Sequence, residues 1–119
     1  SGTSALEIIL RYLNIGEGDE VIMSSFLNAS PLQAVVNLKA KPILIDIDED
    51  SFQISMDNVI EAINEKTKAI ISVDIGGIPC DYDNIKNILE NKKHLFKPSK
   101  NKYQKELKRI LFLSTPLIL

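Results

Sequence analysis

Two short, nearly continuous apolar segments constrain the fold of this chain more than any other feature. They are Pro42–Ile47 (PILIDI) and Lys68–Val73 (KAIISV), and each has the length of a buried strand rather than of a helix. A strand that is apolar on both faces must be covered on both faces, which is typical of the interior of a parallel sheet. Helical patterns alternate with these strands, as parallel connections require. The sequence therefore predicts an α/β fold, a three-layer sandwich with a mostly parallel sheet.

The remaining segments extend this alternation. We expect further strands at residues 20–23 and 110–113, and helices over 4–13, 32–38, 56–63 and from Asp81 or Asp83 to about 91. Ser30 and Ser55 stand where the side chain of a helix N-cap belongs, and Pro31 suits the first turn that follows. The helix over 4–13 is apolar on most sides. We expect this helix and the strand Lys68–Val73 to leave apolar surface that so short a chain cannot cover.

Composition and charge exclude several classes of protein. The chain has 119 residues, which suggests one domain, and a net charge of -2, which does not indicate a nucleic-acid partner. Its single cysteine, Cys80, allows no internal disulfide and favours a reducing, cytoplasmic compartment. No apolar run approaches the roughly 20 residues of a membrane-spanning helix. The lysine-rich stretch 92–108 is interpreted as a solvated insertion.

Four stretches of sequence, taken in order, resemble one protein family. The stretches are SGTSAL (1–6), IGEGDEVI (15–22), AKPILIDIDEDSFQIS (40–55) and KTKAIISVDIGGIPCDYDNI (66–85). Each is weak alone, but their order and spacing are similar to the DegT/DnrJ/StrS-type sugar aminotransferases, a branch of the fold-type I pyridoxal-phosphate enzymes. The resemblance implies that residues 1–119 are a partial pyridoxal-phosphate-binding large domain, truncated at both ends.

The resemblance assigns four residues to cofactor binding. Gly2, Thr3 and Ser4 stand where the chain enters the first helix, and backbone N–H groups at such a position form an anion site. In the family this site holds the cofactor phosphate, although plain helix capping also explains these residue types. The position where the family places an aromatic ring against the pyridine is Asn28, a departure from the pattern; Phe26 is either a substitute or a core residue.

The loop after Lys68–Val73 contains two residues, Asp74 and Cys80, whose side chains could take part in chemistry. This loop borders the active site in the family. Asp74 is interpreted either as a polar wall of the site or as the cap of a strand-end turn. Cys80 has no evident partner that would activate its thiol, so we interpret it as a spectator.

The catalytic groups of the family have no counterpart here. The aspartate that pairs with the pyridinium nitrogen corresponds to Thr115, and the Schiff-base lysine lies beyond the stretch that this chain covers. The family reads Asp-Ala-Ala-His-Ser where this chain reads TPLIL (115–119). Because a shift of one nucleotide can convert the first reading into the second, we expect a frameshifted tail there. The sequence thus predicts no catalytic residue and no metal ligand in this chain.

The function that follows is that of an enzyme fragment, inactive by itself. The resemblance implies a parent that transfers an amino group, typically from glutamate, to a keto group of a nucleotide-linked sugar, with pyridoxal 5'-phosphate as cofactor. It also implies that the parent is a homodimer. Two alternatives stay open: another fold-type I enzyme that acts on amino acids, and a non-catalytic α/β module that binds a phosphate ligand or a protein partner.

Overall fold

Four parallel strands form one sheet in the order β2-β1-β3-β4. The strands are β1 (Glu20–Ser24), β2 (Lys41–Ile45), β3 (Thr67–Asp74) and β4 (Leu111–Pro116). The helices are α1 (Gly2–Tyr12), α2 (Ala29–Asn37), α3 (Met56–Ala62) and α4 (Tyr82–Lys92), and α4 continues into the 3₁₀ turn η1 (Lys93–Leu95). The computed structural model describes residues 2–25, 29–48, 50, 54–74, 82–98 and 109–116.

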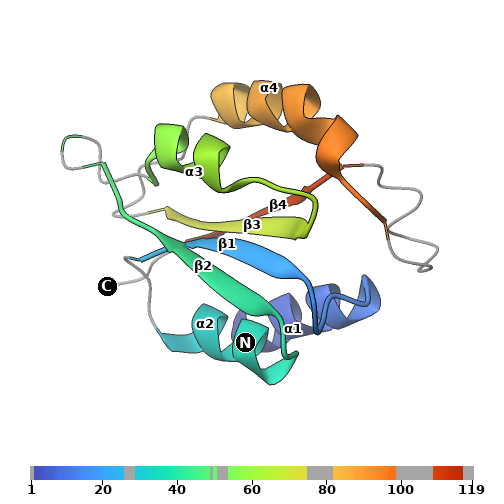
Figure 1. Ribbon diagram of the computed structural model, residues 1–119. Coiled ribbons are helices and arrows are strands. Elements are labelled where there is room, and N and C mark those ends of the chain that lie inside the picture. The colour runs from blue at the N-terminus through green and yellow to red at the C-terminus, as the bar shows by residue number, and fades with distance from the viewer. Residues whose placement is uncertain are drawn as a thin grey trace.

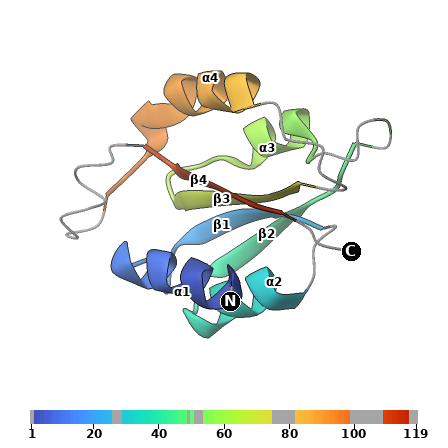
Figure 2. The same cartoon turned by 180° about the vertical axis from the view of Figure 1, so that it is seen from behind.

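The helices cover both faces of the sheet, so the predicted three-layer α/β sandwich is confirmed. Helices α1 and α2 lie on one face, and α3 and α4 lie on the other (Figure 1). The view from behind shows the same separation, with the sheet between the two helical layers (Figure 2). Each parallel connection therefore runs through a helix packed on the sheet.

The side chains of the two central strands alternate between the two layers, as the pleat of a strand requires. On β1, Ile22 joins the core beneath α3 and α4, whereas Val21 and Met23 join the core above α1 and α2. On β3, Ile70 and Ile71 divide in the same way. All five side chains are at most 2% exposed. This two-sided burial explains why the strands read as continuous apolar runs.

Two expectations about uncovered surface have different outcomes. Strand β3 is not an exposed element: it lies between β1 and β4, and Ile70 and Ile71 are buried. Helix α1 does keep apolar surface, because Ile8 is 65% and Tyr12 56% exposed. Ile9 is also 40% exposed. The helix meets the sheet through a narrower stripe than its sequence indicates.

The capping predictions were partly wrong. Ser30 lies inside α2, which begins at Ala29, so Ser30 does not occupy the cap position. Pro31 does lie in the first turn of that helix. Ser55 is the N-cap residue of α3, but its side chain makes no capping hydrogen bond. The backbone N–H of Ser55 instead donates to the carbonyl oxygen of Asp46, at 3.1 Å.

The turn between α1 and β1 requires a glycine at one position. Gly18 has a φ of +91°, in the left-handed region that L-residues rarely adopt. The turn is closed on both sides, because Asp19 N–H donates to the Gly16 carbonyl at 3.0 Å and Gly16 N–H donates to Asp19 Oδ2 at 3.0 Å.

We expect Gly18→Ala to destabilise the chain by about 1 kcal/mol through backbone strain, since a Cβ there meets no atom within 4 Å. The matched control is Glu17→Ala at the exposed neighbouring residue, which should change the free energy of unfolding little. Urea denaturation followed by circular dichroism compares the two. Equal midpoints for both variants would contradict the strain argument.

Candidate active site

The carboxyl ends of all four strands lie at one edge of the sheet because the strands are parallel. In register, Ser24 of β1 stands beside Ile45 of β2, and Asp74 of β3 stands beside Pro116 of β4. This edge is at the left of Figure 1. In open α/β sheets, ligands bind outside the carboxyl ends of the strands. A ligand-binding site is therefore expected at this edge.

Helix α1 directs its N-terminus toward this edge (Figures 1 and 2). The helix begins at Gly2, so Gly2, Thr3 and Ser4 all belong to its first turn. The first N–H groups of a helix have no partner within the helix, and they carry the positive end of the helix dipole. No acidic residue lies in this turn to oppose an anion. The backbone here offers an anion site, and the assignment of Gly2, Thr3 and Ser4 to a cofactor phosphate stays a prediction.

The sheet fixes the position of this helix N-terminus. Leu6 and Leu10 of α1 are 4% and 0% exposed, and they belong to the same core cluster as Val21 and Ala69 of the central strands. On the exposed side, Arg11 Nη2 is 2.8 Å from Glu7 Oε1 one turn earlier. The inner contacts therefore determine where the first turn points.

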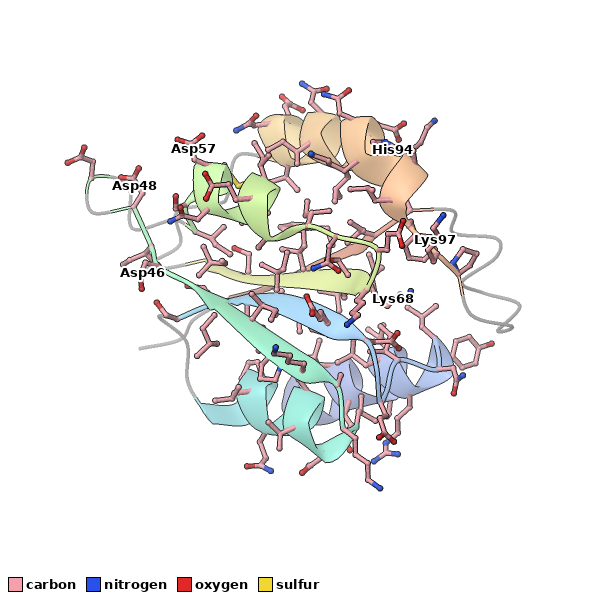
Figure 3. All side chains as sticks on the ribbon, viewed as in Figure 1. Asp46, Asp48, Asp57, Lys68, His94 and Lys97 are labelled. Carbon is pink, nitrogen blue, oxygen red and sulfur yellow. The ribbon has the colours of Figure 1, made fainter. Side chains whose placement is uncertain are left out.

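A second polar arrangement lies at the carboxyl ends of β1 and β2. The N–H of Ser25 donates to the Ile45 carbonyl at 2.8 Å, and its Oγ donates to Asp46 Oδ1 at 3.2 Å. Figure 3 shows Asp46 and Asp48 at this edge, far from the labelled lysines. The bonds fix the direction in which the chain leaves β1, toward the segment that contains Asn28. The sequence analysis missed this pair, although serine and aspartate each follow a neighbouring parallel strand.

Some of the residues singled out in the sequence lie outside the described part of the chain, whereas Thr115 lies within it. Phe26, Asn28 and Cys80 lie outside the described residues, as do residues 99–108. Thr115 is placed by its backbone: it continues β4 and stands beside Val73. Thr115 therefore lies at the carboxyl edge, on the strand next to β3; its correspondence to the ring-nitrogen aspartate stays a prediction.

The described lysines lie away from the N-terminus of α1. Four of them precede or begin strands, at the amino edge of the sheet, and the others lie on α4 or directly after it, across the sheet from α1. They are Lys39, Lys41, Lys66 and Lys68 in the first group, and Lys86, Lys92, Lys93 and Lys97 in the second. The part of the chain that the structure describes thus places no lysine beside the candidate phosphate site.

A hollow of about 350 Å³ lies on the other face of the sheet, between α4 and β4. Apolar side chains form much of its wall, with Lys86 and Arg109 among them. It is separated from the first turn of α1 by the sheet. Among residues 2–25, 29–48, 50, 54–74, 82–98 and 109–116, no group of three or more His, Cys, Asp or Glu side chains is placed to hold a metal ion. None of the described helices is both long and apolar enough to cross a membrane.

Comparison with known proteins identifies the family. Residues 1–96 match the model of the DegT/DnrJ/EryC1/StrS aminotransferase family. The chain belongs to this family. The matched range contains α1, the three strands β1 to β3 and all of α4, so it includes the first turn of α1 and the sheet that positions it. The family resemblance read from the four sequence stretches is confirmed.

Solved structures of DegT/DnrJ/EryC1/StrS aminotransferases show the same fold. Spr1654 of Streptococcus pneumoniae, assigned as a sugar aminotransferase and solved in its PMP form, shares 41% identity over 96% of this chain, with a TM-score of 0.92. DesV of S. venezuelae, solved with a ketimine intermediate, shares 33% over 81%, with a TM-score of 0.72. A family member from Brucella abortus shares 33% over 76%, with a TM-score of 0.69. The chain spans 28%, 25% and 26% of these three chains, respectively.

Proposed function

We propose that this chain forms the phosphate-binding part of a pyridoxal-phosphate site in an enzyme that transfers an amino group to a keto sugar nucleotide. The observation that carries the proposal is the N-terminus of α1, held at the carboxyl edge of a parallel sheet in a chain of the aminotransferase family. The PMP and PLP forms of Spr1654 support this cofactor class. The amino donor is an amino acid, and the sugar acceptor is nucleotide-linked.

The described residues fit the phosphate end of pyridoxal phosphate better than its ring end. The first turn of α1 offers N–H groups, and the hydroxyl groups of Thr3 and Ser4 follow Gly2 in the sequence. These groups would bind and orient the phosphate, and Asn28 would lie against the ring. When bound, pyridoxal phosphate supplies the electron sink for amino-group chemistry. The lysine that binds this cofactor covalently has no counterpart among the described residues beside the site, so we propose that other parts of the enzyme provide it.

A second candidate function is a non-catalytic module that binds a phosphate ligand. The position of the described lysines favours it, because none of them lies beside the N-terminus of α1. Both functions require phosphate binding at the N-terminus of α1, and they differ in whether amino transfer follows. We further propose that the enzyme is a cytoplasmic homodimer, with the single Cys80 consistent with a reducing compartment.

The phosphate site can be tested in the 119-residue chain by equilibrium dialysis with pyridoxal phosphate. We expect weak binding that inorganic phosphate competes away, since the contact is made through the phosphate. Thr3→Ala and Ser4→Ala should each weaken binding roughly twofold to tenfold by removing one hydrogen-bond donor. The matched control is Ser55→Ala, because this serine at the start of α3 makes no side-chain capping bond.

Either of two results would contradict a phosphate site at α1. One is pyridoxal-phosphate binding that inorganic phosphate does not reduce, and the other is equal affinity for pyridoxal phosphate in all three variants. The substrate class needs a separate assay in the gene product that contains this chain. There we expect glutamate to donate its amino group to a nucleotide-linked keto sugar in preference to a small keto acid. The reverse preference would favour the alternative enzyme that acts on amino acids.

A further inference from the structure

Lys68 is a buried lysine at the amino edge of the sheet, on the side away from the candidate phosphate site. It is the second residue of β3 and is 7% exposed. Lysine is almost never fully buried unless it is paired, because removing an ammonium group from water is costly. The burial of Lys68 therefore requires specific partners.

Three groups surround the ammonium of Lys68. Its Nζ donates a hydrogen bond to the carbonyl oxygen of Lys97. The same Nζ lies 5.5 Å from the centroid of the Phe96 ring, within the range of a cation–π contact, and 3.9 Å from Asp19 Oδ1. Figure 3 shows Lys68 and Lys97 near the same end of the sheet. A backbone acceptor, an aromatic ring and a carboxylate together replace the water that the ammonium gives up.

Two of these three partners belong to one segment, residues 93–98, which we call the strap. The strap follows α4 and contains the turn η1. Most of it faces solvent: Lys93, His94, Lys97 and Pro98 are exposed, and the ion pair of Lys93 with Glu90 is on the surface. Leu95 and Phe96 are the exceptions: Phe96 is 7% exposed and belongs to the core cluster beneath α3 and α4, and Leu95 is half-buried against the same cluster.

The strap is therefore attached at Leu95, Phe96 and Lys97, and Lys68 contacts the last two. The sheet itself does not depend on the strap in the same way. Val21 and Ile71 of the central strands are fully buried in the cluster on the opposite face, with α1 and α2. A segment with few buried contacts can open while the core stays folded.

We propose that Lys68 is a latch that holds the strap against the amino edge, and that the strap opens as a unit without unfolding of the sheet. The ammonium bonds the strap's backbone to β3 through the Lys97 carbonyl. Loss of the ammonium frees the Lys97 carbonyl to bond with water and removes the cation beneath the Phe96 ring. Val21 and Met23 of β1 and Ile71 of β3 keep their contacts with α1 and α2 in the open state.

Hydrogen exchange on the intact chain tests this proposal. In Lys68→Met, which keeps the apolar stem and removes the charge, we expect the amides of Leu95 to Lys97 to exchange roughly tenfold to hundredfold faster. The amides of Val21 to Met23 in β1 should keep their wild-type rates. The control is Lys66→Met, two residues earlier, where the side chain is exposed. Chymotrypsin should also cleave the Phe96–Lys97 bond faster in Lys68→Met than in Lys66→Met.

The proposal fails if the strap and β1 lose protection together in Lys68→Met, or if neither loses it. A measurement on the wild type decides the matter even if Lys68→Met does not fold. At low urea concentrations, strap amides should exchange at rates that urea barely changes, whereas β1 amides should follow global unfolding. If both sets of amides show the urea dependence of global unfolding, the strap does not open on its own.

Discussion

Leu10→Ala should remove a large part of the stability of this chain and abolish phosphate binding with it. Leu10 is 0% exposed and packs in the cluster that joins α1 to the central strands. Removing such a side chain costs about 2–5 kcal/mol through lost burial and the cavity left behind. A domain of this size has on the order of 5–15 kcal/mol in total. Because α1 presents the candidate phosphate site, a helix that loses its packing also loses the orientation of its first turn.

The matched control for this prediction is Ile8→Ala, two residues away on the same helix. Ile8 is 65% exposed, so its truncation should change the free energy of unfolding by no more than about 0.5 kcal/mol and leave binding intact. Urea denaturation gives the stabilities, and dialysis with pyridoxal phosphate gives the affinities. Equal unfolding midpoints for the two variants would contradict the packing of α1 described above. Wild-type affinity for pyridoxal phosphate in Leu10→Ala would show that binding does not depend on the packing of α1.

The alternation of strands and helices could be predicted because both periodicities are local properties of the sequence. The runs around Ile43 and Ile70 are apolar at successive positions, and this requires cover on both faces. Short strands joined through helices leave a parallel sheet as the simple arrangement. The layers and the sheet direction followed from this argument, and the structure confirms them.

The order of the strands could not be predicted in the same way, and one error came from this. Lys68–Val73 was expected to expose an apolar face, but the strand lies between β1 and β4. Neighbours in a sheet are set by crossovers that span many residues, and no local pattern in β3 reveals them. For α1, the sequence indicated uncovered apolar surface but not which apolar residues would face the sheet. Apolar residues around most of a helix do not show which stripe meets the sheet.

Hydrogen bonds and ion pairs of individual side chains were harder to predict from the sequence than the strands and helices. Ser30 and Ser55 have the residue type that N-caps prefer, yet Ser30 lies within α2 and Ser55 makes no side-chain cap. Residue preference describes many helices, whereas one hydrogen bond depends on the rotamer and on a competing partner. Lys68 shows the same limit. Its sequence neighbours suggest an ordinary charge at a strand end, and its burial arises from Asp19 and Phe96, which are distant in the chain.

The assignment of a cofactor-binding role to the start of α1 stays a prediction, but the structure shows which part of its geometry the sequence could indicate. Gly2 to Ser4 were assigned through the family resemblance, and the structure places their backbone in the first turn of α1. The direction of that turn follows from the core contacts of the helix, which no local sequence pattern specifies. The hydrogen bond of Ser25 to Asp46 joins residues 21 positions apart. It depends on the register of β1 against β2, which the sequence did not provide.

Reduction with borohydride in the presence of pyridoxal phosphate should give no covalent adduct at a single, phosphate-protected lysine. A ligand held by its phosphate at the first turn of α1 would lie at the carboxyl edge of the sheet. The described lysines lie at the amino edge or on the α4 side of the sheet. A covalent bond at the site needs an amine within reach, since positioning supplies most of the advantage of a bound reactant over a free one. Peptide mapping of the reduced chain measures where adducts form.

Exposed lysines such as Lys66 and Lys93 provide the internal control for this experiment, because free pyridoxal phosphate can react with any accessible amine. Their adducts should be scattered, increase in proportion to reagent and remain unchanged when inorganic phosphate is added. An adduct confined to one lysine and suppressed by phosphate would contradict the prediction, and its position would identify the missing covalent partner. If that lysine were Lys68, the latch would be wrong as well, because an amine bonded to Lys97 and enclosed by Phe96 is not available for reaction.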